Sequence, residues 1–160
     1  LEQTRLEGIE QLRETETVNL TALIQDLLTH MSPLFDGLQL SVHLEKGITL
    51  PGDSKLLERG IGNLLSNAAR YCSPGGRVRL ELKQGPVLIV ENDADPIPED
   101  ELPRLFEMFY RGDKARDRSG SGMGLAIAQR IFSLHHLSCK AENIDGGVQF
   151  KLETNTAQSS

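Results

Sequence analysis

The sequence predicts an α+β fold, a two-layer sandwich in which three helices cover one face of a mixed β-sheet. Segments 20–35 and 53–71 carry apolar residues at helical spacing, and a shorter periodic segment covers 123–135. Short segments with alternating or continuous apolar residues lie between and after these helices. The order does not alternate strictly as βαβ, so a doubly wound parallel sheet is not expected.

Length and composition indicate one ordinary globular domain. The 160 residues are 38% hydrophobic and 25% charged. A net charge of −6 argues against nucleic acid as the main partner. The two cysteines, Cys72 and Cys139, form no C-x-x-C pair, so we expect free thiols and a reducing compartment. No run of residues reaches the length of a membrane span, and no signal peptide is visible.

In the first third of the chain, one long helix is the clearest element. Asn19 or Thr21 can cap it, and Pro33 should end or kink it. Short strands are expected on both sides, at 15–19, at 38–44 (half-buried, because its apolar residues alternate) and at 48–50.

The second half of the chain carries most of the predicted sheet. The apolar run 87–90 suits a central strand. Residues 98–106 suggest a short helix bent by Pro103, and the polar, glycine-containing segment 113–122 a mobile loop. Further strands are expected at 78–82 and, as a hairpin, at 138–141 and 148–152.

The helix from Asp53 to Tyr71 has a polar face that attracts attention. Asp53 is a plausible N-cap, and Asn63, Asn67 and Arg70 lie within roughly 60° of one another, with Tyr71 at the edge. Asn is a poor helix former, so two on one face need compensation. A carboxamide oxygen can bind Mg²⁺, and an arginine can meet phosphates. The alternative is a polar helix face in water.

A glycine-rich turn opens the third predicted helix. Residues 120–125, GSGMGL, would offer free N–H groups and a positive helix end to an anion. This turn follows the aromatic block 105–111, LFEMFYR, which ends in Arg111. Together with the two asparagines, these features favour a phosphate-binding site.

Three segments in this order resemble a known family. NLLSNAARY is similar to the N box, LFEMFYR to the F box and GSGMGLAIAQ to the G2 box of sensor histidine kinases, in the ATP-binding GHKL (Bergerat-fold) superfamily. The resemblance covers about residues 16–152. It implies that residues 1–14 are the tail of an upstream dimerisation helix plus a linker, and that 15–152 are the catalytic ATP-binding domain. Residues 153–160 lack an apolar pattern, and we expect a disordered tail.

The resemblance also implies roles for individual residues, with ATP and Mg²⁺ as cofactors. Asn67 would hold Mg²⁺, Asn63 would face the phosphates, and these two with Arg111 would form the catalytic set. Arg118 adds a further cation in the same loop. The other implied nucleotide contacts are Arg70, Tyr71, Ile97, Phe106, Tyr110, Lys114, Arg116, Gly120, Gly122, Met123, Gly124 and Leu125.

The G1 box departs from the family pattern D-x-G-x-G, whose Asp accepts the adenine amino proton. Counting back from the F box without a gap places Asn92 at the Asp position, with Ala94 and Pro96 replacing both glycines. A one-residue shift would place Asp93 there instead. Asn92 could still accept through its amide oxygen, but as a neutral acceptor it makes a weaker bond. We therefore expect weaker or altered adenine selection.

Asn63 argues against ATP hydrolysis. In the hydrolysing members of the superfamily a Glu at about this position activates water, and an amide cannot take a proton at neutral pH. None of the four histidines lies in an H-E/D-x-x-x-P setting, so the phosphoacceptor His is expected upstream of Leu1.

The function most consistent with these features is that of the catalytic domain of a bacterial two-component sensor histidine kinase. It would transfer the ATP γ-phosphoryl group to a His on the upstream dimerisation domain, from which a response regulator takes it. We expect this chain to be monomeric, and the whole protein to be a homodimer anchored in the membrane with this domain in the cytoplasm. The alternatives are a regulatory module with weak or no nucleotide binding, which the G1 box favours, and an anti-sigma-type serine kinase.

Overall fold

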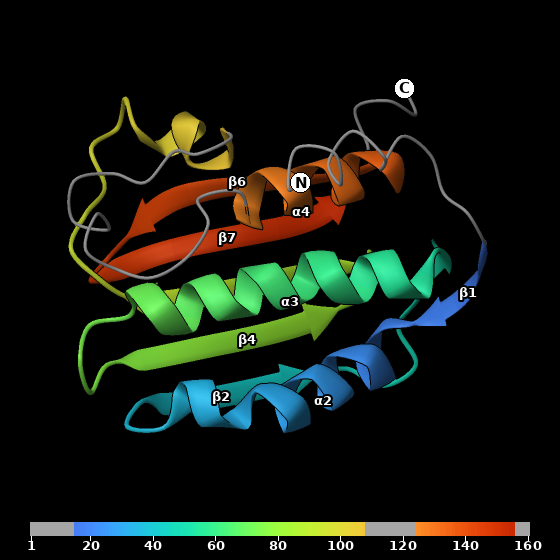
Figure 1. The fold of residues 1–160 in the computed structure, drawn as a ribbon, viewed down its shortest axis with the longest axis horizontal. Coiled ribbons are helices and arrows are strands. Elements are labelled where there is room, and N and C mark those ends of the chain that lie inside the picture. Colours follow the sequence, from blue (N-terminus) through green and yellow to red (C-terminus); the bar gives the residue numbers. More distant parts are fainter. Residues whose placement is uncertain (1–14, 108–123, 156–160) are drawn as a thin grey trace, which may run out of the picture.

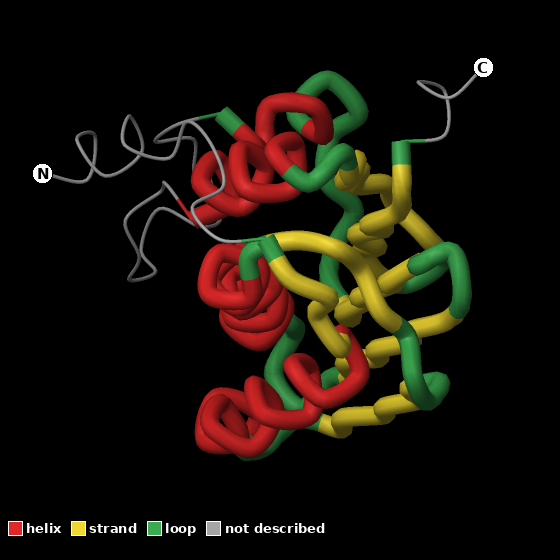
Figure 2. The backbone as a smooth tube through the Cα atoms, turned by 90° about the vertical axis from the view of Figure 1, so that its right-hand side faces the viewer, coloured by secondary structure: helices red, strands yellow, loops and turns green. Residues whose placement is uncertain are grey.

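Three α-helices cover one face of a five-stranded sheet in the computed structural model, which describes residues 15–107 and 124–155 (Figure 1). Figure 2 shows the helices on one side and the strands on the other. The arrangement confirms the predicted α+β sandwich. Its helices are α2 (Leu20–Met31), α3 (Ser54–Tyr71) and α4 (Gly124–Leu134).

The main sheet is mixed, as predicted. Its order is β2-β4-β5-β7-β6, with β2 parallel to β4 and every other pair antiparallel. The apolar run that suggested a central strand lies in β5, the third of the five. The strands are β2 (Gln39–Leu44), β4 (Arg77–Lys83), β5 (Val87–Asp93), β6 (Leu137–Ile144) and β7 (Gly147–Thr154).

Helix α2 begins and ends where its sequence signals lie. The Asn19 side chain accepts a hydrogen bond from the N–H of Ala22 at 3.0 Å, whereas Thr21 bonds the backbone of residues 45 and 48. The helix passes into the 3₁₀ turn η1 (Ser32–Phe35), which contains Pro33. Strand β1 (Glu16–Asn19) pairs with β3 (Thr49–Gly52) in a separate two-stranded sheet.

Helix α3 buries its apolar face completely. Asp53 caps it by accepting a hydrogen bond from the N–H of Leu56 at 3.2 Å. Burying each large side chain contributes about 1.5–3 kcal/mol, so packing against the sheet fixes the orientation of this helix. The residues of this face are at most 1% exposed: Leu57, Ile61, Leu64, Leu65 and Ala68.

Strand β2 is less covered than predicted. Leu40 and Val42 pair with the buried Val78 and Leu80 of β4, yet they remain 38% and 41% exposed. The prediction of a half-buried strand was therefore wrong. Alternation indicates which face of a strand is apolar, but β2 is an edge strand and no described element lies beyond it.

Two other elements differ from expectation in their bounds. The segment 98–106 contains a 3₁₀ turn, η2 (Leu102–Phe106), with Pro103 in its first turn. Strand β7 runs to Thr154, two residues past the expected end of the domain at 152, and residues 156–160 lie outside the described part. Cys72 and Cys139 are buried and free, and burial raises the pKa of the Cys139 thiol to about 12.

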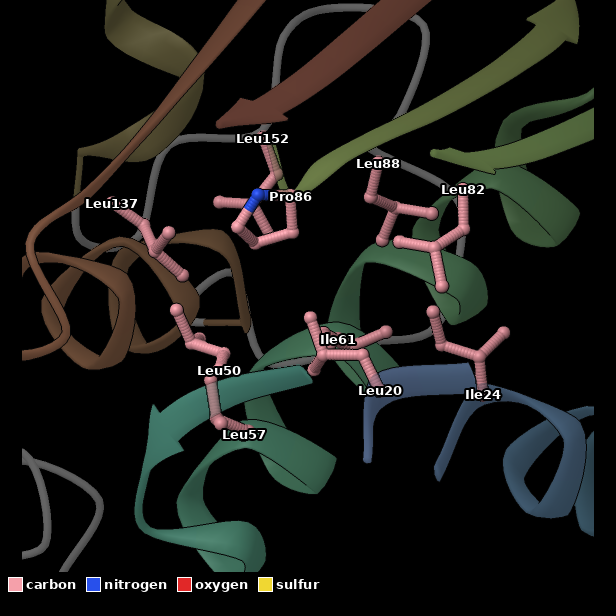
Figure 3. A pocket seen from close by; sticks show the side chains of 10 residues that line it. All are labelled: Leu20, Ile24, Leu50, Leu57, Ile61, Leu82, Pro86, Leu88, Leu137 and Leu152. Carbon is pink, nitrogen blue, oxygen red and sulfur yellow. The ribbon is translucent and has the colours of Figure 1, made fainter. Parts of the chain in front are cut away.

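A small apolar cavity lies between the helices and the sheet (Figure 3). Its volume is about 10 Å³, at the lower limit of the space that one water molecule needs. This gap is a packing feature and offers no room for a ligand. The cavity is lined by Leu20, Ile24, Leu50, Leu57, Ile61, Leu82, Pro86, Leu88, Leu137 and Leu152.

In the described ranges, no helix combines the length and the apolar character needed to cross a membrane.

Candidate functional site

The polar face of α3 meets the first residue of α4. Asn63 is half-buried, and its Nδ2 donates a hydrogen bond to the carbonyl oxygen of Gly124 at 2.9 Å. Asn67 lies one turn further along the same face and is also half-buried. The asparagine motif and the end of the glycine-rich turn, 61 residues apart in sequence, are therefore neighbours in space.

Close packing of α3 on α4 fixes this meeting point. A Cβ atom on Gly60 would lie 3.0 Å from the ring of Phe132 and 3.2 Å from Ile131. A glycine at this position lets the two helices approach closely. The start of α4, with Gly124 and Leu125 half-buried, is held beside the C-terminal half of α3 (Figure 1).

The opposite end of α3 is fixed through a buried histidine. His135 Nδ1 lies 2.7 Å from the carbonyl oxygen of Ile131, and its Nε2 accepts a hydrogen bond from the N–H of Asp53 at 3.0 Å. These contacts define the neutral tautomer with the proton on Nδ1. The histidine thus joins the end of α4 to the start of α3, so α4 is tied to α3 at both of its ends.

Asn92 and Asp93 point to opposite faces of the sheet. Asn92 follows the buried Leu88 and Val90 on the helix-facing side of β5 and is 4% exposed. Its Nδ2 donates a hydrogen bond to the carbonyl oxygen of Asp93 at 3.3 Å. That oxygen is only an acceptor, so the contact selects this orientation of the amide and turns Oδ1 away from it.

Asp93 is engaged on the open face. Its Oδ2 accepts hydrogen bonds from the N–H of Arg77 at 2.9 Å and from the Arg77 guanidinium at 3.3 Å. The backbone hydrogen bond, with a smaller contribution from the guanidinium, lowers the pKa of the Asp93 carboxyl. Asn92, and not Asp93, therefore faces the layer that contains Asn63 and Asn67.

The loop after β5 is fastened to the end of the β6–β7 hairpin. Ala94 N–H donates to the carbonyl oxygen of Gly146 at 3.2 Å. The side chain of Asn143 bonds both the N–H and the carbonyl oxygen of Ile97, each at 2.8 Å. At the far end of the loop, Phe106 packs edge-to-face on Phe150, with ring centroids 5.9 Å apart.

Sequence reasoning missed Asn143. Its position gave a usable signal, because it continues the inward-facing series Cys139 and Ala141 on β6. An Asn on the buried face of a strand requires hydrogen-bond partners. Those partners lie 46 residues away in the chain, and spacing alone does not reveal them.

A groove lies on the open face of the sheet, at the end of β5 that carries Asn92 and Asp93. Its volume is about 570 Å³. The charges that line it pair with one another, Arg77 with Asp93 at 3.3 Å and Arg79 with Glu91 at 3.7 Å. Its charged lining lies on the side of the sheet away from Asn63, whereas Asn92 belongs to the buried face of β5 and connects the groove to the helix-facing side. The groove is lined by Gln39, Leu40, Ser41, Arg77, Val78, Arg79, Glu91, Asn92, Asp93, Ile144 and Asp145.

The remaining predicted site residues fall into two groups, one inside and one outside the described part of the chain. Arg70 and Tyr71 are described: they end α3, with Arg70 exposed and Tyr71 half-buried. In residues 15–107 and 124–155, no three His, Cys, Asp or Glu side chains gather as a metal site. The predicted residues outside these ranges are Tyr110, Arg111, Lys114, Arg116, Arg118, Gly120, Gly122 and Met123.

Comparison with known proteins identifies the family. Residues 52–158 match the profile described as histidine kinase-, DNA gyrase B-, and HSP90-like ATPase. The sensor protein CzcS of Cupriavidus metallidurans is 34% identical over 145 residues, 87% of this chain. The histidine-protein kinase/phosphatase MprB of a Mycobacterium species is 36% identical over 137 residues, 82% of this chain. The chain spans 30% and 26% of the lengths of these two relatives.

Solved structures agree with this assignment. The mycobacterial sensor histidine kinase MprB superposes with a TM-score of 0.76 at 27% identity, covering 87% of this chain and 95% of that one. The catalytic domain of histidine kinase ThkA has a TM-score of 0.78 at 22% identity, with coverage of 89% and 95%, and supports the fold alone. The chain belongs to the family of histidine kinase-, DNA gyrase B- and HSP90-like ATPases, as an ATP-binding domain of the sensor histidine kinase type.

Proposed function

We propose that this domain binds ATP with Mg²⁺ and supplies the γ-phosphoryl group to a histidine of an upstream dimerisation domain. The observation that carries the proposal is the hydrogen bond between Asn63 and Gly124. It brings the asparagine face of α3 to the N-terminal end of α4, where free N–H groups and the helix dipole favour phosphate.

The residues present fit both groups. Asn67 is half-buried on the same face as Asn63, and its amide oxygen suits a cation that takes oxygen ligands and keeps phosphates as partners. Bound Mg²⁺ would neutralise charge on the phosphates. Arg70, exposed at the end of α3, is proposed to contact the phosphates, and Arg111 is proposed to act beside it.

Asn92 is the residue proposed to bind the adenine base. Its Oδ1 is turned away from Asp93 on the helix-facing side, where it can accept a hydrogen bond from the adenine amino group. The nearby Ile97 and Phe106 pack on the core and would form the apolar surface for the ring. Asp93 is tied to Arg77 on the other face, which disfavours its alternative assignment to adenine.

Transfer to a protein nucleophile is favoured over hydrolysis. Asn63 stands where a general base would be needed, and its amide donates to Gly124. Positioning and charge neutralisation provide most of the catalysis in phosphoryl transfer, so this chain need not supply a base. We further propose that the whole protein is a membrane-anchored homodimer with this domain in the cytoplasm, and that a response regulator accepts the phosphoryl group.

Calorimetry of ATP binding with and without Mg²⁺, on the wild type and on Asn67→Ala, tests the proposal. We expect Mg²⁺-dependent binding that Asn67→Ala weakens about 10-fold or more, a loss of about 1.4 kcal/mol. Ser66→Ala is the matched control, since Ser66 is an equally half-buried neighbour outside the proposed site. Absence of binding at millimolar ATP would instead favour the regulatory module.

A further inference from the structure

Every hydrogen-bonding group of the Asn143 side chain is bonded to the loop that follows β5. Its Oδ1 accepts the N–H of Ile97 at 2.8 Å, and its Nδ2 donates to the carbonyl oxygen of Ile97 at 2.8 Å and to Glu99 Oε2 at 3.1 Å. An Asn amide has two donor hydrogens and one oxygen. Each of these groups has a partner here.

The pair of bonds to Ile97 imitates strand pairing. In an antiparallel ladder, one residue exchanges both its N–H and its C=O with the residue opposite, and here a single side chain provides both partners. Ile97 stands between Pro96 and Pro98, whose φ angles are fixed and which have no N–H to offer. Ile97 is therefore the point between these prolines where a donor and an acceptor can fasten the backbone.

The fastened loop continues directly into the peptide that orients Asn92. The carbonyl oxygen of Asp93, which accepts from Asn92 Nδ2, immediately precedes Ala94, the first loop residue. The same oxygen also accepts the N–H of Ser73 at 2.8 Å, so the loop is the second of two anchors beside it. Loss of the anchor at Ile97 would loosen the peptide that follows Asp93, and the amide of Asn92 could then turn to present its NH₂ group. Adenine offers an amino donor at the ring position where guanine offers a carbonyl acceptor. The orientation of Asn92 therefore determines which base it can bond.

We propose that Asn143 is a positioning residue for base recognition. By holding Ile97, it keeps Asn92 Oδ1 as the outward group and makes the site select adenine over guanine. This inference rests on the proposed function, because it concerns the base-binding end of the same nucleotide site. It also accounts for how the chain retains an ordered loop with Ala94 and Pro96 in place of the expected glycines.

Asn143→Asp tests the proposal, because it keeps an acceptor for Ile97 N–H but removes both donor hydrogens. The dissociation constants of ATP and of GTP are measured by calorimetry in the presence of Mg²⁺. We expect the preference for ATP over GTP to fall about 10-fold in Asn143→Asp, whereas Asn67→Ala weakens both nucleotides alike and leaves the preference unchanged. Glu142→Ala, an exposed neighbour on the other face of β6, should match the wild type.

A second readout needs no nucleotide. Hydrogen exchange at the Ile97 amide in the ligand-free domain should be slow in the wild type and faster in Asn143→Asp. Glu99→Ala removes one of the three bonds and leaves the pair to Ile97, so it should shift both readouts in the same direction by less. It also serves if Asn143→Asp fails to fold.

Two results would overturn the inference separately from the proposed function. If the domain binds ATP but a folded Asn143→Asp keeps the wild-type preference for ATP over GTP, Asn143 does not position the base site. Unchanged exchange at the Ile97 amide would have the same meaning. A wild-type domain that binds neither nucleotide would instead refute the proposed function, and this inference with it.

Discussion

The two faces of α3 obey different constraints although they share one helix. The apolar face, which includes Ile61, Leu64 and Leu65, is at most 1% exposed and fixes the helix on the sheet. The polar face, which includes Asn63 and Asn67, is half-buried and carries the hydrogen bond from Asn63 to Gly124. Stability therefore depends on one face and the proposed binding on the other, and substitutions should separate the two.

The largest expected effect comes from the apolar face. Leu64→Ala removes a side chain that is 1% exposed and leaves a cavity between α3 and the sheet. Such changes cost about 2–5 kcal/mol, so the midpoint of urea unfolding should fall sharply. If the variant is still folded at low temperature, its ATP affinity should stay near that of the wild type. A loss of less than about 1 kcal/mol would contradict the described packing.

Periodicity was enough to predict this face, because 3.6-residue spacing depends on the local sequence alone. The same reasoning failed at β2, where Leu40 and Val42 alternate correctly yet remain exposed. Whether a strand is covered depends on which elements lie beside it, and that is a property of the whole fold. Burial is thus predictable from pattern only where another element completes the layer.

The residues of the candidate site also divide into those that local sequence predicts and those that only the whole fold brings together. Asn63 and Asn67 could be predicted because one helix turn brings them together and a family motif includes them. Asn143 could not, because its bonds to Ile97 connect segments 46 residues apart. The opposite orientations of Asn92 and Asp93 follow from strand alternation once the exact bounds of β5 are known. The sequence did not define these bounds, and it therefore left Asn92 and Asp93 as alternatives for the adenine contact.

A change at the start of α3 should lower stability and leave ATP binding almost unchanged. Asp53→Ala removes the cap that accepts from the N–H of Leu56. Loss of such a cap costs about 1 kcal/mol. Asn67 lies roughly 20 Å further along the axis at 1.5 Å per residue, so ATP affinity should change less than twofold. Urea unfolding and calorimetry on the same variant check both parts, and Lys55→Ala, at an exposed position two residues after the cap, is the control.

A large change in ATP affinity would revise the comparison of the two faces. If Asp53→Ala weakened ATP binding strongly in a folded domain, the start of α3 would be coupled to the site. The contact of His135 with the N–H of Asp53 would be the path to test, since it connects this point to the end of α4. A lowered free energy of unfolding with an unchanged ATP affinity would confirm that the cap stabilises the helix without affecting the site.

The smallest effect tests whether β5 divides its faces as α3 does. The carboxyl pKa of Asp93 lies below its ordinary value of 3.8, mainly because the Arg77 N–H bonds the carboxylate. Because the pKa of this carboxyl is lower in the folded than in the unfolded chain, the carboxylate stabilises the domain at any pH above the unfolded-state pKa. This contribution is lost as the pH falls through the folded-state pKa. Asp93→Asn should therefore lose at most about 1 kcal/mol at neutral pH, and the difference from the wild type should vanish in acid.

Binding of ATP completes the test, because Asp93 points away from the helix-facing side. Asp93→Asn should leave the dissociation constant of ATP unchanged, whereas Asn92→Ala should raise it by removing the acceptor proposed for the adenine amino group. The opposite pattern, with ATP lost in Asp93→Asn and kept in Asn92→Ala, would mean that Asp93 meets the base. The open face of the sheet would then belong to the nucleotide site, and the separation of structural from binding faces would hold for α3 but not for β5.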